Sequence, residues 1–220
     1  SSLNLELYDE WKDTDIVKDL ITFLDNVLQF FIDNAPDYIK KARYSAIQER
    51  SLGLGAMGLH SLFQKNRIPF ESIRAATLNE EIFKKIKDDA LEQTKLLATE
   101  KGECPDMKGT GKRNSHLLAI APNANSSMIT GCSPSIEPHK ANAYTHRTRA
   151  GSHLIQNKYL REELQKLNMD IPEVWTSIIT NGGSVQHLEF INDSIKEVFK
   201  TAIEIDQRVI IKLGGERQKY

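Results

Sequence analysis

The sequence predicts an α/β protein that is rich in helices and poor in strands. Apolar residues recur at helical spacing over residues 16–31 and again over residues 78–100, and both stretches are long enough for amphipathic helices. Residues 2–5 are half apolar and are interpreted as the end of a strand, and residues 117–121 form a short apolar run. The second is bounded by polar residues and by Pro122, and we interpret it as a buried strand. Two strands are too few to close a sheet or a barrel, which indicates a fragment of a larger α/β fold.

The remaining elements are expected to be short helices with recognisable ends. Gly102 should end the long helix in a left-handed conformation. Asp170 should cap a later helix, with Pro172 in its first turn, and Gly214-Gly215 should close the last one. We expect these further helices at residues 37–46, 159–167, 171–180 and 194–213, and an irregular or extended chain at residues 133–150.

Charge and cysteine content exclude several classes of protein. The chain has 29 basic and 30 acidic residues and a formal net charge of -1, which gives no electrostatic reason to expect a nucleic acid or a membrane as partner. No apolar run is long enough to cross a bilayer. Cys104 and Cys132 lie in unrelated contexts, so a reducing compartment, the cytoplasm, is the simpler expectation. The first residues, 1–5, are neither a signal peptide nor a natural start, and we expect the chain to begin inside a longer parent.

A glycine motif at residues 53–58, GLGAMG, matches the G-x-G-x-x-G pattern of dinucleotide-binding turns. That function needs an apolar strand directly before the motif, and residues 45–50 are too polar to form one. We therefore favour a structural role, in which the glycines allow close packing or a positive φ at a strand-to-helix turn.

The loop at residues 122–127, PNANSS, is the most informative local feature. It opens where the predicted strand ends, and α/β proteins bind ligands at the carboxyl ends of their strands. Its small residues expose backbone N–H groups, and a helix beginning near Ser127 would add its own free N–H groups to an anion site. The residues leave two interpretations open, a phosphate site or an ordinary helix cap.

Histidine and cysteine spacing gives no metal site. None of the six histidines forms a pair with metal-ligand spacing, and we expect no metal to be bound. Cys132 could be a reactive thiol if the preceding loop binds phosphate. A lone cysteine is more often a small buried packing residue, which is the interpretation that we favour.

Several segments together resemble the large subunit of class I ribonucleotide reductases. The resemblance extends from about residue 2 to residue 220, and its force lies in the order and spacing of modest motifs. These motifs are ERSLGLGAMGLH at residues 49–60, RNSHLLAIAPNANSS at 113–127, SPSIEP at 133–138, GSVQHL at 183–188 and FKTAIEIDQR at 199–208, the last two similar to the phage and bacterial type.

The resemblance implies that residues 1–220 are the C-terminal portion of a ten-stranded α/β barrel domain, helix-rich and incomplete at both ends. It implies that the parent reduces ribonucleoside diphosphates at C2′. By position, Asn123, Ala124, Asn125 and Ser126 should bind the substrate phosphate, with Ser127 as a helper. The family's loop usually carries more Thr or Ser at positions 123 and 125, but an Asn amide can also donate to phosphate.

The resemblance also implies what this chain does not carry. Neither Cys104 nor Cys132 occupies a redox position of the family, so we expect no catalytic residue and no bound cofactor here. The expected partners are the remainder of the large subunit, which would hold the radical and redox cysteines, and the small radical-generating subunit. Thioredoxin or glutaredoxin would reduce the complex, and the compartment would be the cytoplasm, or the host cytoplasm for a virus.

Two alternatives belong to other functional classes. The chain could be a non-catalytic assembly module that completes a partner's barrel, or an independent phosphate-binding α/β protein. The first predicts that Asn125→Ala and Ser126→Ala leave turnover unchanged, and the second predicts a stable monomer. An incomplete barrel should instead expose apolar strand edges.

Overall fold

The computed structural model describes residues 1–149 and 151–220. Its strands are β1 (Ser2–Asn4), β2 (Gly55–Met57), β3 (Ala143–Thr148) and β4 (Gly151–Gln156). Its α-helices are α1 (Tyr8–Trp11), α2 (Ile16–Asn34), α3 (Lys40–Glu49), α4 (Leu59–Lys65), α5 (Ile73–Lys101), α6 (Ala124–Thr130), α7 (Lys158–Lys166), α8 (Pro172–Thr180), α9 (Asp193–Val198) and α10 (Gln207–Arg217). Three short 3-10 turns are η1 (Leu5–Leu7), η2 (Asp37–Ile39) and η3 (Pro105–Met107).

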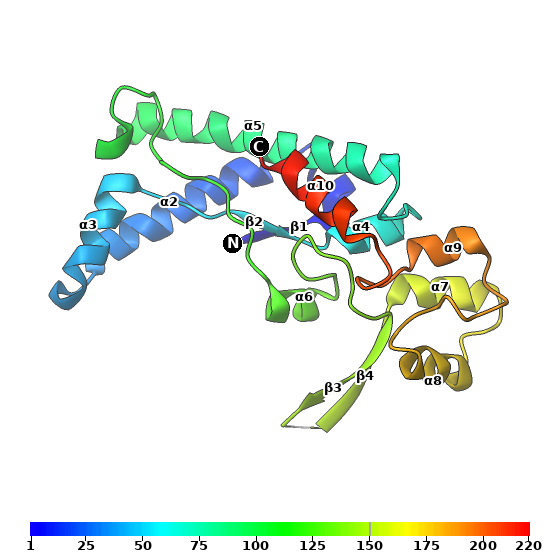
Figure 1. Cartoon of the computed structure of the whole chain (residues 1–220). Helices are drawn as coiled ribbons and strands as arrows, with labels where there is room; N and C mark the ends of the chain where they lie inside the picture. The colour runs from blue at the N-terminus through cyan, green and yellow to red at the C-terminus, as the bar shows by residue number, and fades with distance from the viewer. Residues whose placement is uncertain (150) are drawn as a thin grey trace.

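A parallel pair of short strands lies at the centre of the molecule (Figure 1). β1 pairs with β2 in the register Leu3 to Ala56, and a third extended segment, residues 117–121, joins the other side through a parallel bridge between Leu54 and Leu118. The backbone N–H of Leu54 donates to the carbonyl of Leu117 at 2.9 Å. The predicted strand therefore exists, but only as one bridge.

The burial predicted for residues 117–121 is wrong. Leu117 and Leu118 are half-buried, whereas Ile120 is 45% exposed. The described residues cover this segment on the β2 side and leave its outer side open, so an apolar composition here reflects a surface that this chain does not cover by itself.

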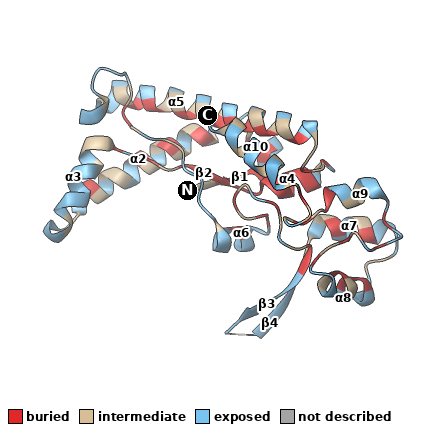
Figure 2. Cartoon of the chain, viewed as in Figure 1, coloured by how far each residue is buried: buried red, intermediate tan, exposed pale blue. Residues whose placement is uncertain are grey.

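The larger hydrophobic core lies between the strands and the long helices. α5 runs across α2 along one side of the molecule, and buried residues face the contact (Figure 2). The most deeply buried apolar residues of α2 are Val17 and Ile21, whereas Val27, one of the apolar residues at helical spacing within 16–31, is 49% exposed. α5 begins five residues before the predicted start at 78, where Ser72 accepts a hydrogen bond from the N–H of Ala75 at 3.1 Å.

A second, smaller core holds the last third of the chain together. Leu160 of α7, Ile178 of α8 and Phe199 after α9 are almost fully buried in it. The β3–β4 hairpin projects from this part and is mostly exposed (Figures 1 and 2). The irregular or extended chain predicted at 133–150 agrees with β3 over the described residues, and residue 150 lies outside them. The pairing of β3 with β4 was not predicted.

Two predicted helix ends are wrong, and a third is right in position but not in conformation. Gly102 ends α5 as predicted, but its φ of 85° and ψ of 158° lie outside the left-handed helical region. Asp170 does not cap α8, because its carboxylate accepts a hydrogen bond from Trp175 Nε1 at 2.7 Å and Ile171 occupies the cap position. The predicted helix at 194–213 is interrupted between α9 and α10, and Gly214 and Gly215 lie inside α10.

Candidate functional site

The helix that follows the loop at residues 122–127 begins earlier than the sequence predicted. Asn123 lies in the left-handed region, with φ 52° and ψ 30°, and α6 starts at Ala124. The first intrahelical bond runs from the N–H of Ser127 to the carbonyl of Asn123 at 2.9 Å. Asn125, Ser126 and Ser127 are therefore the first turn of a helix and not an open loop.

The start of α6 presents free donors. Within the described part of the chain, no hydrogen bond is made by the N–H groups of Ala124, Asn125 and Ser126, and all three residues are exposed. Such N–H groups carry the positive end of the helix dipole and favour an anion. The side chains of Asn125 and Ser126 make no hydrogen bond within the described residues either.

A cavity of about 470 Å³, which we call the loop cavity, opens between the strands and the start of α6. Ser2 of β1, Met57 of β2 and Ile120 contribute to its wall, together with Asn123 and Ser126. The lining of this cavity is therefore neutral or apolar, and Ser126 is the donor residue that takes part in it. Ser2 and Met57 were not predicted as site residues, since nothing in the local sequence brings positions 2 and 57 to position 123.

The glycine motif keeps this wall closely packed. An added Cβ at Gly55 would lie 2.6 Å from the carbonyl oxygen of Ala119 and 3.1 Å from Ser2 Oγ. Gly58 has φ 83° and directly precedes α4. The structural role predicted for the glycines is confirmed: one lets residues 117–121 approach β2, and the other permits the turn into a helix.

The predicted site residues separate onto two sides of α6. Asn123 and Ser126 face the loop cavity, whereas Ala124 and Ser127 line a second cavity of about 430 Å³, which we call the hairpin cavity. Ser127 is buried, and its hydroxyl donates to the carbonyl of Ala124 at 3.2 Å. To bind a phosphate, as predicted, the Ser127 hydroxyl would first have to break its hydrogen bond to Ala124.

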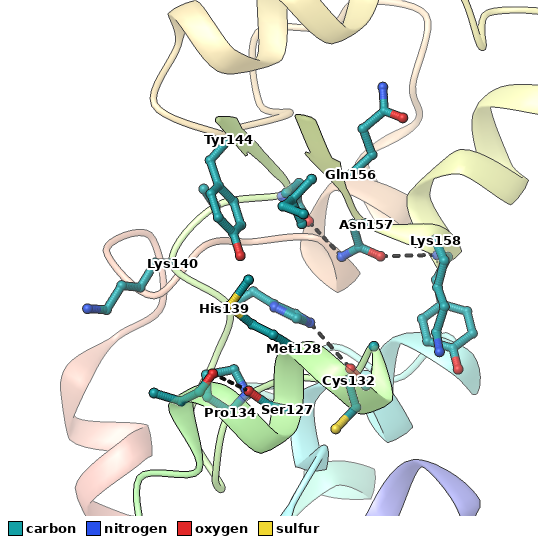
Figure 3. A pocket seen from close by; sticks show the side chains of 17 residues that line it. Ser127, Met128, Cys132, Pro134, His139, Lys140, Tyr144, Gln156, Asn157 and Lys158 are labelled. Atoms are coloured by element: carbon teal, nitrogen blue, oxygen red, sulfur yellow. Dashed lines mark hydrogen bonds between the residues drawn. The ribbon is translucent and has the colours of Figure 1, made fainter. Parts of the chain in front are cut away.

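The hairpin cavity lies between α6 and the base of the β3–β4 hairpin (Figure 3). Tyr144 reaches from β3 toward Met128 and His139, and Lys158 forms the far side. His139 Nε2 lies 3.3 Å from Ser61 Oγ of α4. Burial, with a contribution from the charge of Lys158, lowers the pKa of His139 to about 4, so this imidazole is neutral at pH 7.

Both cysteines are free and buried. Burial raises the pKa of the Cys132 thiol above its usual range, although a contact with Thr130 Oγ1 at 3.2 Å opposes the shift. Burial likewise raises the pKa of Cys104. A raised pKa disfavours the thiolate that nucleophilic or redox chemistry requires. The burial predicted for Cys132 is confirmed.

Among the described residues, no group of three or more His, Cys, Asp or Glu side chains is placed to hold a metal ion. None of the described helices combines the length and the apolar composition that crossing a membrane would require.

Parallel strands followed by helices, with a donor-rich turn at the carboxyl end of a strand, are the arrangement of an α/β barrel enzyme. Comparison with protein families identifies which barrel. The chain matches the family model "Ribonucleotide reductase, barrel domain" over residues 1–110 and 106–220, and it belongs to that family. The resemblance found in the sequence is confirmed.

Relatives extend over the whole chain. It is 52% identical over 223 residues to the "Putative ribonucleoside-diphosphate reductase large subunit" of Frog virus 3 (isolate Goorha), covering 100% of this chain and 40% of that protein. It is 48% identical to the large subunit of Invertebrate iridescent virus 6, with 100% of this chain and 24% of that protein covered.

A solved structure shows the same fold. The Actinobacillus ureae class Id ribonucleotide reductase alpha subunit matches with a TM-score of 0.93 and 42% identity, over 100% of this chain and 41% of that one. The chain thus spans less than half the length of these relatives. The described residues do not form a closed barrel. They form two two-stranded sheets and one isolated β-bridge.

Proposed function

We propose that this chain supplies the substrate-phosphate site of a ribonucleotide reductase large subunit that reduces ribonucleoside diphosphates to deoxyribonucleotides. The site comprises Asn123, Ala124, Asn125, Ser126 and, as a helper, Ser127. The observation that carries the proposal is the set of free, exposed N–H groups at the start of α6, next to the loop cavity that Ser126 lines, in a chain that aligns along its whole length with reductase large subunits.

The chemistry proposed for the chain is positioning. Free N–H groups and the hydroxyl of Ser126 would bind the diphosphate, and this contact would orient the ribose against groups held elsewhere. The described residues offer no low-pKa thiol for radical or redox chemistry. We therefore place the cysteines in the remainder of the large subunit, which would also supply the other strands of a ten-stranded barrel.

The proposed partners follow from this division. A small subunit would generate the radical, and thioredoxin or glutaredoxin would reduce the complex, in the cytoplasm or a host's cytoplasm. Residues 1–220 would form the C-terminal portion of the barrel domain, and the chain alone would be inactive.

The test is turnover by the complete reductase carrying Ser126→Ala or Asn125→Ala. Each variant should raise KM for a ribonucleoside diphosphate by roughly 10-fold, because a hydrogen bond to a charged group contributes about 1.5–3 kcal/mol. Ser45→Ala, an exposed serine on α3, is the control and should leave KM unchanged. Unchanged KM in both loop variants would reject the phosphate site.

A second function, a non-catalytic assembly module, is favoured by a different surface. Leu118 and Ile120 border a third cavity of about 560 Å³ together with Phe83 of α5 and Tyr220. A strand that is incompletely paired and exposes apolar residues can pair with a strand of another chain. Loop variants that bind the remainder of the subunit normally and leave turnover intact would support this function in place of the first.

A further inference from the structure

One residue of the proposed phosphate site has its side chain engaged elsewhere. Asn123 Oδ1 accepts a hydrogen bond from Ser2 Oγ of β1 at 3.0 Å. Its Nδ2 donates to the carbonyl of Ala121 at 3.0 Å and, more weakly, to that of Ala56 in β2 at 3.4 Å. A single amide thus connects β1, β2 and the segment that leads into α6.

These contacts occupy the hydrogen-bonding groups of the Asn123 amide. An asparagine side chain has two N–H donors and one carbonyl oxygen. Both kinds of group are engaged with protein atoms on the side of the strands. Any donation from Nδ2 to a phosphate would have to break the bond to Ala121 or to Ala56, which makes Asn123 a poor ligand.

The backbone of Asn123 sets the direction of α6. Its φ of 52° is a left-handed value that asparagine and glycine adopt more readily than other residues. Its carbonyl accepts the first intrahelical bond, from the N–H of Ser127 at 2.9 Å. The orientation of the free N–H groups of residues 124–126 therefore depends on where Asn123 is held.

We propose that Ser2 and Asn123 form a clip that fixes the start of α6 against β1 and β2, so that Asn123 is a positioning residue and not a phosphate ligand. This inference rests on the proposed function, because it concerns how the same site is held ready. A loop that is already ordered binds without first losing conformational freedom, whereas a loosened loop must be ordered by the substrate.

The clip makes a specific prediction for kinetics of the complete reductase with CDP as the probe. Ser2→Ala removes one hydroxyl on β1, and Asn123→Gly removes the amide while keeping access to the left-handed backbone. Each should raise KM about fivefold, the equivalent of one neutral hydrogen bond, with kcat changed less than twofold because saturating substrate restores the loop. Ser2→Thr keeps the hydroxyl and should restore KM.

A double-mutant cycle separates positioning from ligation. The variant with both Ser2→Ala and Asn123→Gly should have the same KM as Asn123→Gly alone, because both changes break one clip. Ser126→Ala, a proposed ligand, should add its effect to either. Additive effects of Ser2→Ala and Asn123→Gly would instead show that the two residues act independently and would overturn the clip.

The outcomes also distinguish failure of the clip from failure of the proposed phosphate site. If Ser126→Ala and Asn125→Ala leave KM unchanged, the phosphate site itself fails. If those variants raise KM and Ser2→Ala does not, the phosphate site stands and the clip is wrong. Ser45→Ala again serves as the control for substitution of an exposed serine.

Discussion

Asp25 is the most heavily partnered buried charge in the described residues. It lies on α2 and is fully buried, with Arg113 Nε at 2.9 Å, Arg50 Nε at 3.0 Å and Asn114 Nδ2 at 3.1 Å. Burial alone would raise the pKa of this carboxyl group, but the hydrogen bonds from Arg113 and Asn114 and the charge of Arg50 lower it. The cluster thereby ties α2 to the segment that precedes the loop at residues 122–127.

Replacing Asp25 should be costly. Asp25→Asn leaves two buried guanidinium groups without a counter-charge, and we expect the free energy of unfolding to fall by about 3–5 kcal/mol. Urea denaturation at pH 7 measures the change. Asp33→Asn, on the exposed side of the same helix, is the matched control and should change stability by less than about 0.5 kcal/mol. Equal stabilities of the two variants would contradict this account.

At the scale of elements, the central strands depend on a close approach of two backbone segments. β2 and residues 117–121 can pair only because Gly55 presents no side chain to the carbonyl of Ala119. Ala119 also lines the loop cavity, whereas Gly55 lies behind it and lines the third cavity. The pairing of these elements, and with it the place of Ala119 in the cavity wall, therefore depends on one glycine.

Gly55→Ala should push residues 117–121 away from β2. The expected cost is about 1–3 kcal/mol, since an overpacked contact forces the backbone to shift. Gly215→Ala is the control, because this glycine lies inside α10 with no atom within 4 Å of an added Cβ. Alanine is the better helix former there, and thermal unfolding should show an unchanged or raised Tm. A higher Tm for Gly55→Ala would refute the close-approach argument.

At the scale of the whole molecule, the described residues form two hydrophobic cores. His60 of α4 belongs to the first part, and His139 leads toward the second. The N–H of His139 donates to His60 Nδ1 at 2.9 Å, and the two rings lie 5.4 Å apart. Burial lowers the pKa of both histidines, so neutral rings are part of the folded junction.

Acid should weaken this junction. A base whose pKa is lower in the folded than in the unfolded state binds protons more readily when unfolded, so stability falls as the pH drops below about 6.5 and the loss ends near pH 4. For His139 alone we expect a loss of about 2 kcal/mol between pH 7 and pH 5. Denaturation at both pH values measures it, and His139→Gln should remove this part of the slope. If the pH dependence of stability were the same in His139→Gln, protonation of His139 would not be linked to unfolding.

The sequence by itself determined the family, the strand at residues 2–4 and most helices, and it singled out the loop at residues 122–127. It could do so because helical periodicity, glycines and motif order are local properties of the chain. The same local signals misplaced the end of the last helix at Gly214-Gly215 and missed the β3–β4 hairpin, where pairing partners decide.

Only the tertiary structure decided what each loop residue faces. It placed Ser126 at the loop cavity, buried Ser127 on the other side of α6 and engaged the amide of Asn123 with Ser2, 121 positions away. The physical reason is that side-chain direction follows from helix start and strand pairing, which join segments distant in sequence. An apolar run such as residues 117–121 likewise specifies a strand, but its burial depends on what packs against its outer side.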